Sequence, residues 1–265
     1  MRLAGKVAIV VGAGQTPGDT IGNGRATAIS FAREGARLLL VDRNGDSARE
    51  TQEMVSAEGG EASAFEADVT DENACRAIAA ECASRYGRID VLHNNVGIGA
   101  GDAGAVHLEL DAWRRILDVN LTAMFLSCKH VLPHMREQRS GSIINISSLA
   151  SIAAAVGMLA YKVSKAGVNA LTQQIAMTNA RHGIRCNAIL PGLMNTPMAV
   201  EGIAQARGID KEVLIKARDS MVPLRAEMGT AWDVANAAVF LASDEAKFIT
   251  GVLLPVDGGQ SIKIG

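Results

Sequence analysis

The chain has 265 residues, of which 48% are hydrophobic and 20% are charged, and its formal net charge is -2. This composition is typical of an ordered globular protein, and the length is sufficient for one large α/β domain. Only 3% of the residues are aromatic and no basic run is present, which argues against a nucleic-acid-binding function.

Short apolar runs alternate along the chain with longer segments whose apolar residues have helical spacing. The runs predicted as strands are residues 7–11, 36–41, 62–67, 89–93, 142–147, 184–190 and 251–256. The predicted helices are residues 25–34, 46–58, 71–86, 111–138, 160–182 and 231–243. Strands that are apolar on both faces and are joined by helices predict an α/β fold, with a doubly wound parallel β-sheet of about seven strands between two helical layers.

Glycines and one irregular segment indicate how these elements are connected. Gly35, Gly87 and Gly183 each follow a predicted helix, where a left-handed terminal residue is favoured. No repeat or linker interrupts the pattern, so we expect residues 1–265 to form a single domain. Residues 192–225 fall outside the alternation, after the sixth predicted strand. Ligands bind beyond the carboxyl ends of parallel strands, so this segment is either a substrate loop or an ordinary surface excursion.

The cysteines and the N-terminus bear on the cellular location. Four widely spaced cysteines are present, namely Cys75, Cys82, Cys128 and Cys186. They include no Cys-x-x-Cys pair, so we expect free buried thiols in a reducing cytosol, and no metal site. The first residues contain neither a long apolar segment nor a small-residue cleavage site, so we expect neither secretion nor a membrane span. The sequence thus predicts a cytoplasmic protein.

A glycine-rich loop follows the first predicted strand and leads into the first helix. It contains Gly12, Gly14, Gly22 and Gly24. Glycines at this position let the backbone approach a pyrophosphate, whose charge is favoured by a helix N-terminus. Because turns are commonly built from glycine, this cluster alone is a weak signal.

A carboxylate at the end of the second predicted strand strengthens the nucleotide interpretation. Asp42 lies eighteen residues beyond Gly24. A carboxylate there accepts hydrogen bonds from the adenosine ribose hydroxyls and repels a 2′-phosphate, so it favours NAD over NADP. Arg43 is the opposing signal, because a cation at this turn could tolerate the extra phosphate.

Three polar residues have the chemistry to move a proton to or from a carbonyl oxygen. Tyr161 and Lys165 lie four residues apart in a predicted helix, and Ser148 lies at the end of the fifth predicted strand. A phenol titrates near pH ~10, and a lysine ammonium one helical turn away should lower its pKa. Taken alone, a Tyr-x-x-x-Lys pair is more often a capped phenol beside a solvated lysine.

Together these residues make the chain similar to the short-chain dehydrogenase/reductase family in its single-domain, Rossmann-type form. The resemblance extends over essentially the whole chain, and further family motifs occur in order at Asp68-Val69, Asn94-Asn95-Val96-Gly97, Asn120, Pro191-Gly192, Thr196 and Asp257-Gly258-Gly259. It implies cofactor contacts from Asp68, Val69, Asn95, Val96, Gly97, Tyr161, Lys165, Pro191, Gly192 and Thr196, with Asp68 and Val69 flanking the adenine. It also implies catalytic roles for Ser148, Tyr161, Lys165 and Asn120, the last as the holder of a water molecule.

The glycine loop departs from the family pattern. Nine residues separate Gly12 from Gly22, where the family has three. We expect Gly12, Gly22 and Gly24 to hold the pyrophosphate, with Gly14 and Ile21 as further candidates. A longer loop resembles that of the enoyl-thioester reductases, but those enzymes separate tyrosine and lysine by six residues. The three-residue gap here favours alcohol and ketone chemistry.

The leading hypothesis is an NAD-dependent oxidoreductase that transfers hydride between a secondary alcohol or ketone and the cofactor. The alternatives are an NADPH-dependent 3-oxoacyl-thioester reductase, against which Asp42 argues, and a nucleotide-binding protein without turnover. Apolar residues are expected near the open end of the site, where they either line the substrate pocket or, for about half of them, pack in the core; they are Ile98, Leu149, Ala154, Val156, Met158, Leu193, Met194 and Met198. The resemblance also implies a homotetramer, formed through the helices at residues 111–138 and 160–182 and through the C-terminal strand.

Overall fold

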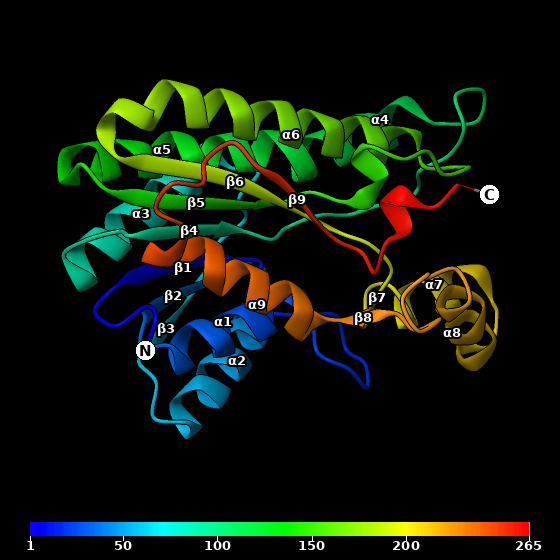
Figure 1. The fold of residues 1–265 in the computed structure, drawn as a ribbon, viewed down its shortest axis with the longest axis horizontal. Coiled ribbons are helices and arrows are strands. Elements are labelled where there is room, and N and C mark those ends of the chain that lie inside the picture. Colours follow the sequence, from blue (N-terminus) through cyan, green and yellow to red (C-terminus); the bar gives the residue numbers. More distant parts are fainter. Residues whose placement is uncertain (265) are drawn as a thin grey trace.

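The computed structural model describes residues 1–264 and places a parallel β-sheet at the centre of the molecule (Figure 1). Its strands are β1 (Val7–Val11), β2 (Arg37–Asp42), β3 (Ala62–Glu66), β4 (Val91–Asn94), β5 (Gly141–Ile146), β6 (Ile184–Pro191) and β9 (Leu253–Val256). Within the described residues, these seven strands are ordered β3-β2-β1-β4-β5-β6-β9, and every neighbouring pair is parallel. The predicted fold class is therefore confirmed.

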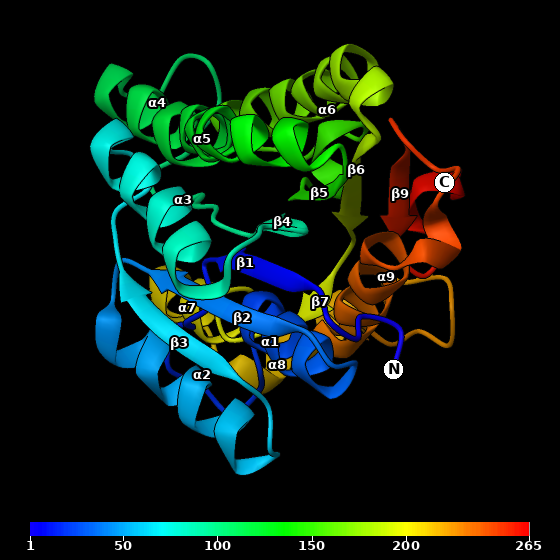
Figure 2. The same cartoon turned by 90° about the vertical axis from the view of Figure 1, so that its left-hand side faces the viewer.

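Helices cover both faces of this sheet (Figure 2). One layer consists of α3 (Glu72–Tyr86), α4 (Leu110–Leu117), α5 (Ala123–Gln138) and α6 (Leu159–Asn179). The opposite layer consists of α1 (Asn23–Arg33), α2 (Gly45–Ala57) and α9 (Ala231–Ala242). Each layer buries one face of the strands, which explains why the strands are apolar on both faces.

The two faces of β1 illustrate how alternate residues build two cores. Ile9 and Val11 are buried in a cluster with residues of α3 and α5. Ala8 and Val10 point the other way, into a cluster with residues of α1 and α9. Successive side chains in a strand point to opposite faces, so one short run contributes to both hydrophobic cores.

Helix boundaries agree with the sequence prediction except in one place. The three terminal glycines adopt left-handed backbone conformations, with φ of 87° at Gly35, 78° at Gly87 and 71° at Gly183. The helix predicted over residues 111–138 is helical throughout, but a π-helical turn, Asp118–Thr122, lies between α4 and α5. A π-turn adds a residue to the helical repeat and changes the direction in which its side chains point.

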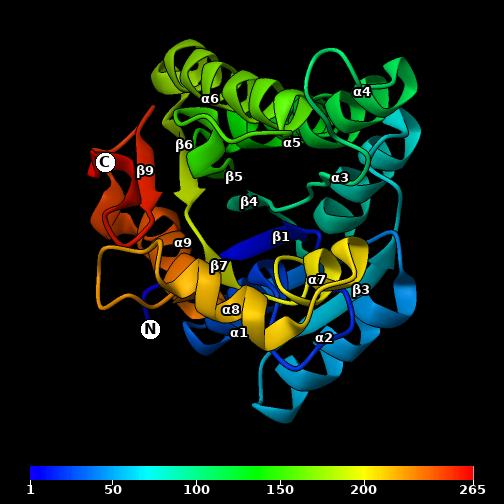
Figure 3. The ribbon, with the colours of Figure 1, turned by 90° about the vertical axis from the view of Figure 1, so that its right-hand side faces the viewer.

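The irregular segment after β6 lies at the carboxyl edge of the sheet (Figure 3). It contains β7 (Met194–Asn195), α7 (Glu201–Arg207) and α8 (Lys211–Asp219), and it ends at β8 (Gly229–Thr230), which pairs with β7. This position is the one at which parallel sheets bind their ligands. Over residues 1–264, every helix falls short of the combination of length and apolarity that crossing a bilayer requires.

His93 is a buried histidine in the middle of the sheet. It is 0% exposed and lies edge-on to Phe31, with the ring centroids 5.9 Å apart. Neither ring nitrogen has a hydrogen-bond partner among the described residues. Burial lowers the pKa of His93 to about 3, so the folded protein holds the imidazole neutral.

This burial predicts a loss of stability in acid. The folded pKa is depressed below the usual ~6.5, so the unfolded chain takes up a proton first as the pH falls. The stabilisation is complete above pH ~6.5 and is lost progressively towards pH ~3, by on the order of 4 kcal/mol for this one group. A His93→Leu variant should lack this pH-dependent loss of stability and be more stable than the parent at pH 5. Urea titrations at several pH values measure the free energy of unfolding, and a His107→Leu variant at an exposed position is the control. The prediction would be contradicted if this free energy fell equally steeply with pH in the parent and in His93→Leu.

Candidate active site

Residues from five strands meet at the carboxyl edge of the sheet. Gly12 follows β1, Asp42 ends β2, Asn95 follows β4, Ser148 follows β5 and Gly192 follows β6. The chain runs outward in opposite directions from β1 and β4, so the edge between these two strands is the topological switch point of the sheet. The structure thus brings together residues that lie up to 180 positions apart in the sequence.

The end of β1 and the start of α1 approach each other so closely that side chains are excluded. Gly12 has a φ of 79°, and a Cβ at Gly24 would lie 1.9 Å from the Gly12 carbonyl oxygen. The same oxygen accepts a hydrogen bond of 3.1 Å from the side-chain amide of Asn95. Gly22, the N-cap of α1, provides no side-chain cap hydrogen bond. A bare helix N-terminus beside a glycine turn fits the pyrophosphate of a dinucleotide.

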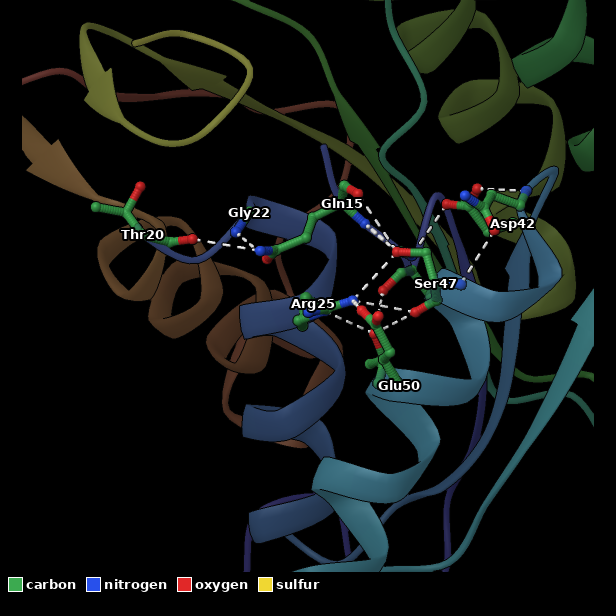
Figure 4. Close-up of polar contacts among 11 residues, drawn as sticks. Gln15, Thr20, Gly22, Arg25, Asp42, Ser47 and Glu50 are labelled. Carbon is green, nitrogen blue, oxygen red and sulfur yellow. Dashed lines mark hydrogen bonds and ion pairs between the residues drawn. The ribbon is translucent and has the colours of Figure 1, made fainter. Parts of the chain in front are cut away.

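The additional residues of the loop fold back on themselves (Figure 4). The Gln15 side chain accepts a hydrogen bond of 2.9 Å from the Gly22 amide and donates one of 3.3 Å to the Thr20 carbonyl. The Ser47 hydroxyl, at the start of α2, accepts a hydrogen bond of 2.9 Å from the Gln15 amide. The Ile21 side chain packs against Ala26 and residues of α9, so this predicted cofactor residue has a structural side chain.

The tip of the loop reaches the segment after β6. The Asp19 amide donates a hydrogen bond of 3.0 Å to the Glu201 carboxylate, and the Asp19 carboxylate forms an ion pair with Lys211. A Cβ at Gly18 would lie 2.8 Å from the Pro197 Cβ. The six additional residues therefore connect the glycine turn to α7 and α8, a contact that the sequence did not predict.

Backbone amides fix the carboxylate of Asp42 at the end of β2. It accepts hydrogen bonds of 2.9 Å from the Gly14 amide and 3.0 Å from the Asn44 amide.

Arg43 is exposed at this turn. The backbone N–H and hydroxyl of Thr70 and, more weakly, the charge of Arg43 lower the pKa of Asp68. Cofactor contacts at Asp68 and Arg43 remain a prediction.

A buried guanidinium supports the glycine loop from behind (Figure 4). Arg25 of α1 donates hydrogen bonds to the Thr51 hydroxyl at 2.9 Å, the Ser47 carbonyl at 3.1 Å and the Glu50 carboxylate at 2.8 Å. Thr51 in turn donates to the Ala13 carbonyl at 2.8 Å. These contacts attach α2 to both ends of the loop. Sequence analysis missed them because their partners lie on different helices.

Tyr161, Lys165 and Ser148 lie together beside the loop that follows β4. The Lys165 side chain is 2% exposed and donates a hydrogen bond of 2.8 Å to the Ile146 carbonyl. The Lys165 Nζ lies 5.8 Å from the Tyr161 ring centroid, and a Cβ at Gly97 would lie 3.0 Å from the same nitrogen. The ammonium therefore lies close to the phenol ring, and Ser148 is near enough to the phenol to affect its pKa.

Burial changes the proton affinities of this cluster. It raises the pKa of Tyr161, an effect that hydrogen bonding with Ser148 opposes. It lowers the pKa of Lys165 to about 7. The prediction that Lys165 lowers the pKa of the phenol is therefore wrong for the protein chain by itself. The physical reason is that desolvation penalises the charged forms of both groups, and for the phenol it exceeds the opposing effect of Ser148.

Asn120 joins the loop after β4 to α6. The π-turn directs its fully buried side chain towards Ile98, whose amide donates to Asn120 Oδ1 at 2.7 Å and whose carbonyl accepts from Nδ2 at 2.9 Å. Nδ2 also donates to the Ser164 hydroxyl at 3.0 Å. Both amide hydrogens are used, while Oδ1 retains one lone pair that a water molecule could occupy.

The remaining predicted residues fall into two groups. The Gly192 amide donates to the Val256 carbonyl at 2.9 Å, and the Thr196 carbonyl accepts from the Val200 amide at 2.9 Å, so both are fixed near the edge of the sheet. The residues expected near the substrate pocket include both buried and exposed side chains, and the cofactor contact expected at Val69 remains a prediction. Met194 and Val69 pack in the hydrophobic cores, and Val156 is exposed. Apolar character alone did not separate core from pocket.

Comparisons with known proteins agree with this geometry. The family model described as "Enoyl-(Acyl carrier protein) reductase" matches residues 19–261. A 2,5-dichloro-2,5-cyclohexadiene-1,4-diol dehydrogenase of Sphingobium indicum is 37% identical over 99% of both chains, and the 3-oxoacyl-[acyl-carrier-protein] reductase of Thermotoga maritima is 36% identical over 99% of this chain and 100% of its own.

Solved structures extend the likeness to three dimensions. A protein from Burkholderia xenovorans, described as a short-chain dehydrogenase/reductase, has a TM-score of 0.95 and 43% identity, covering 100% of this chain and 99% of its own. An NAD⁺-bound xylitol dehydrogenase has a TM-score of 0.90 and 32% identity, covering 98% of this chain and 100% of its own.

The contact between Gly12 and Gly24 predicts a selective effect of one methyl group. A Gly24→Ala variant should displace α1 from β1, lower the melting temperature and weaken NAD binding by at least tenfold, because the contact involves backbone. At Gly104 nothing lies within 4 Å of an added Cβ, so Gly104→Ala is the control. Thermal melts and NAD titrations measure both effects, and parental values for Gly24→Ala would refute the assignment of this turn to the cofactor.

Proposed function

Since the chain belongs to the short-chain dehydrogenase/reductase family, we propose that it is an NAD-dependent oxidoreductase acting on a secondary alcohol or the corresponding ketone. The observation that carries the proposal is the cluster of Ser148, Tyr161 and Lys165 at the edge of the sheet beside the glycine turn. A bound nicotinamide would supply the hydride acceptor or donor. The residues of the chain then need only position the substrate oxygen and move its proton.

Ser148 and Tyr161 act on that oxygen. Ser148 ends the extended segment after β5, and its hydroxyl also accepts a hydrogen bond of 3.1 Å from the Ala150 amide. As a donor it holds the substrate oxygen within reach of the phenol. During oxidation Tyr161 must first pass its own proton towards Lys165 and solvent, and then accepts the substrate hydroxyl proton as a phenolate. During ketone reduction the phenol donates its proton to the substrate oxygen.

Lys165 and Asn120 maintain this arrangement. The Ile146 carbonyl holds the Lys165 ammonium near Gly97, where its remaining donors can reach a nicotinamide ribose. Because the pKa of Lys165 is about 7, this group can exchange protons at physiological pH. The free lone pair of Asn120 is suited to a water molecule that carries such a proton to solvent.

The preference for NAD rests on Asp42. Its carboxylate is fixed by the Gly14 and Asn44 amides, so it cannot easily turn away from a 2′-phosphate. We assign the adenosine ribose to this carboxylate and the pyrophosphate to Gly12, Gly22 and the first turn of α1.

The choice between alcohol chemistry and double-bond reduction rests on the spacing of Tyr161 and Lys165. The description of the matching family model names an enoyl-thioester reduction, whereas the three-residue gap and Ser148 favour carbonyl chemistry. The runner-up is a 3-oxoacyl-thioester reductase, which performs the same carbonyl chemistry on a different substrate. The segment of residues 192–225 is proposed as the substrate loop within a single domain. The four free cysteines of the protein suit a cytoplasmic location.

A direct test is the absorbance change at 340 nm with the purified protein, a panel of secondary alcohols and ketones, and either cofactor. We expect turnover with NAD, and a loss of about a thousandfold in kcat for Tyr161→Phe with most of the NAD affinity retained, because the phenol moves the proton but provides only one of many expected cofactor contacts. The remote Tyr86→Phe is the control. A preference for NADPH would overturn the role of Asp42. NAD binding without any turnover would favour the binding-protein alternative.

We also propose a homotetramer. Large apolar side chains are exposed on the helical layer of α5 and α6 and near the C-terminus; they include Phe125, Val163, Met177, Phe248, Ile262 and Ile264. Burial of these groups against a second copy of the chain would remove their apolar surface from water, so another copy is a suitable partner.

Sedimentation velocity at micromolar concentration should therefore give a species of four chains. A Met177→Glu substitution on α6 should reduce it to smaller species, because a charge would be buried in an apolar contact. Glu61→Gln, at an exposed polar position, is the control. A monomeric parent would contradict the proposal.

A further inference from the structure

The helix that carries Tyr161 is capped by a residue far away in the sequence. Helix α6 begins at Leu159, and its N-cap, Met158, provides no side-chain hydrogen bond. The carboxylate of Asp102 instead accepts hydrogen bonds of 3.0 Å from the Ala160 amide and 2.8 Å from the Tyr161 amide. These amides belong to the first turn, where a helix leaves its donors without partners.

Two further contacts fix Asp102 itself. One carboxylate oxygen also accepts a hydrogen bond of 2.9 Å from the Ala103 amide. The Asp102 amide donates to the Gly99 carbonyl at 3.2 Å, closing a turn in which Gly101 has a φ of 85°. Arg115 of α4 donates to the Ala100 carbonyl at 2.7 Å. The carboxylate is thus fixed at the helix N-terminus from a turn that is itself fixed.

The segment that ends in Asp102 also borders the proposed catalytic residues. A Cβ at Gly97 would lie 3.0 Å from Lys165 Nζ, and one at Gly99 would lie 3.7 Å from Cδ2 of the Tyr161 ring. Ile98, between them, is held by Asn120. One short segment therefore contacts the ammonium, the phenol ring and the start of the helix that carries both groups.

We propose that Asp102 is a positioning residue for Tyr161. Its carboxylate fixes the first turn of α6 against the segment of residues 97–102 and so sets the place of the phenol relative to Ser148. A negative charge also interacts favourably with the positive end of the helix. Asp102 does not contact reacting atoms, and its role rests on the proposed function of Tyr161.

A positioning role differs from a purely stabilising one in what its loss affects. The glycine turn at Gly12 and Gly24 joins β1 to α1, so it lies on elements other than α6. A displaced phenol should therefore lower kcat while cofactor binding persists. A displacement of about 1 Å in a reacting group can cost about a hundredfold in rate.

The experiment compares Asp102→Ala and Asp102→Asn with Glu109→Ala as the matched control. Glu109 is an exposed acid at the N-cap of α4 and makes no side-chain cap hydrogen bond. Steady-state kinetics with NAD and a secondary alcohol, NAD titration and hydrogen exchange at the amides of Ala160 and Tyr161 are measured for each.

We expect Asp102→Ala to lower kcat by about ten- to a hundredfold, with NAD affinity within twofold of the parent and faster exchange at both amides. Asp102→Asn retains one acceptor oxygen but places its NH2 group against the remaining N–H donors, so it should recover only part of kcat, while Glu109→Ala should match the parent. Parental kcat for Asp102→Ala would overturn the inference, as would a loss of kcat and NAD affinity in equal proportion. A parent chain without turnover would instead overturn the proposed function, and the positioning role with it.

Discussion

The burial of the Lys165 ammonium is the constraint on which the rest of the site depends. A cation removed from water is costly unless acceptors surround it, and its pKa of about 7 reflects that cost. The Ile146 carbonyl at the end of β5 provides the acceptor, and a Cβ at position 97 would lie only 3.0 Å from the ammonium nitrogen. The loop after β4 must therefore pass close to α6, and Asn120 and Asp102 are the residues that hold it there.

The glycine turn shows a second way of bringing backbone close to a ligand. Gly12 and Gly24 are in direct contact, which leaves α1 with a bare N-terminus at the switch point of the sheet. The additional residues do not disturb this contact, because Gln15 closes them into a separate loop. They extend instead to Glu201 and Lys211, so the cofactor turn and the proposed substrate loop share a surface. An exposed ion pair contributes little stability, and its importance lies in where it places the two segments.

Much of the fold could be predicted because its signals are local. The apolar runs and helical spacing identified the strands and the layers, and Gly35, Gly87 and Gly183 were correctly predicted as left-handed helix ends. The π-turn around Asn120 was missed because helical spacing continues through it. Met194, which the sequence placed either in the substrate pocket or in the core, packs in a hydrophobic core, and apolar character alone does not distinguish the two.

The sequence by itself determined where the strands and helices lie along the chain. It also identified the glycine turn, the carboxylate of Asp42 at a strand end and the spacing of Tyr161 and Lys165, since each of these depends on residues close together in the chain. Only the tertiary structure decided the path of the loop from Gln15 to Ile21, the upward shift of the Tyr161 pKa and the cap from Asp102. The physical reason is that hydrogen bonding and desolvation depend on which distant segments pack together. Asp102 and Tyr161 are 59 residues apart, and nothing local to either indicates their contact.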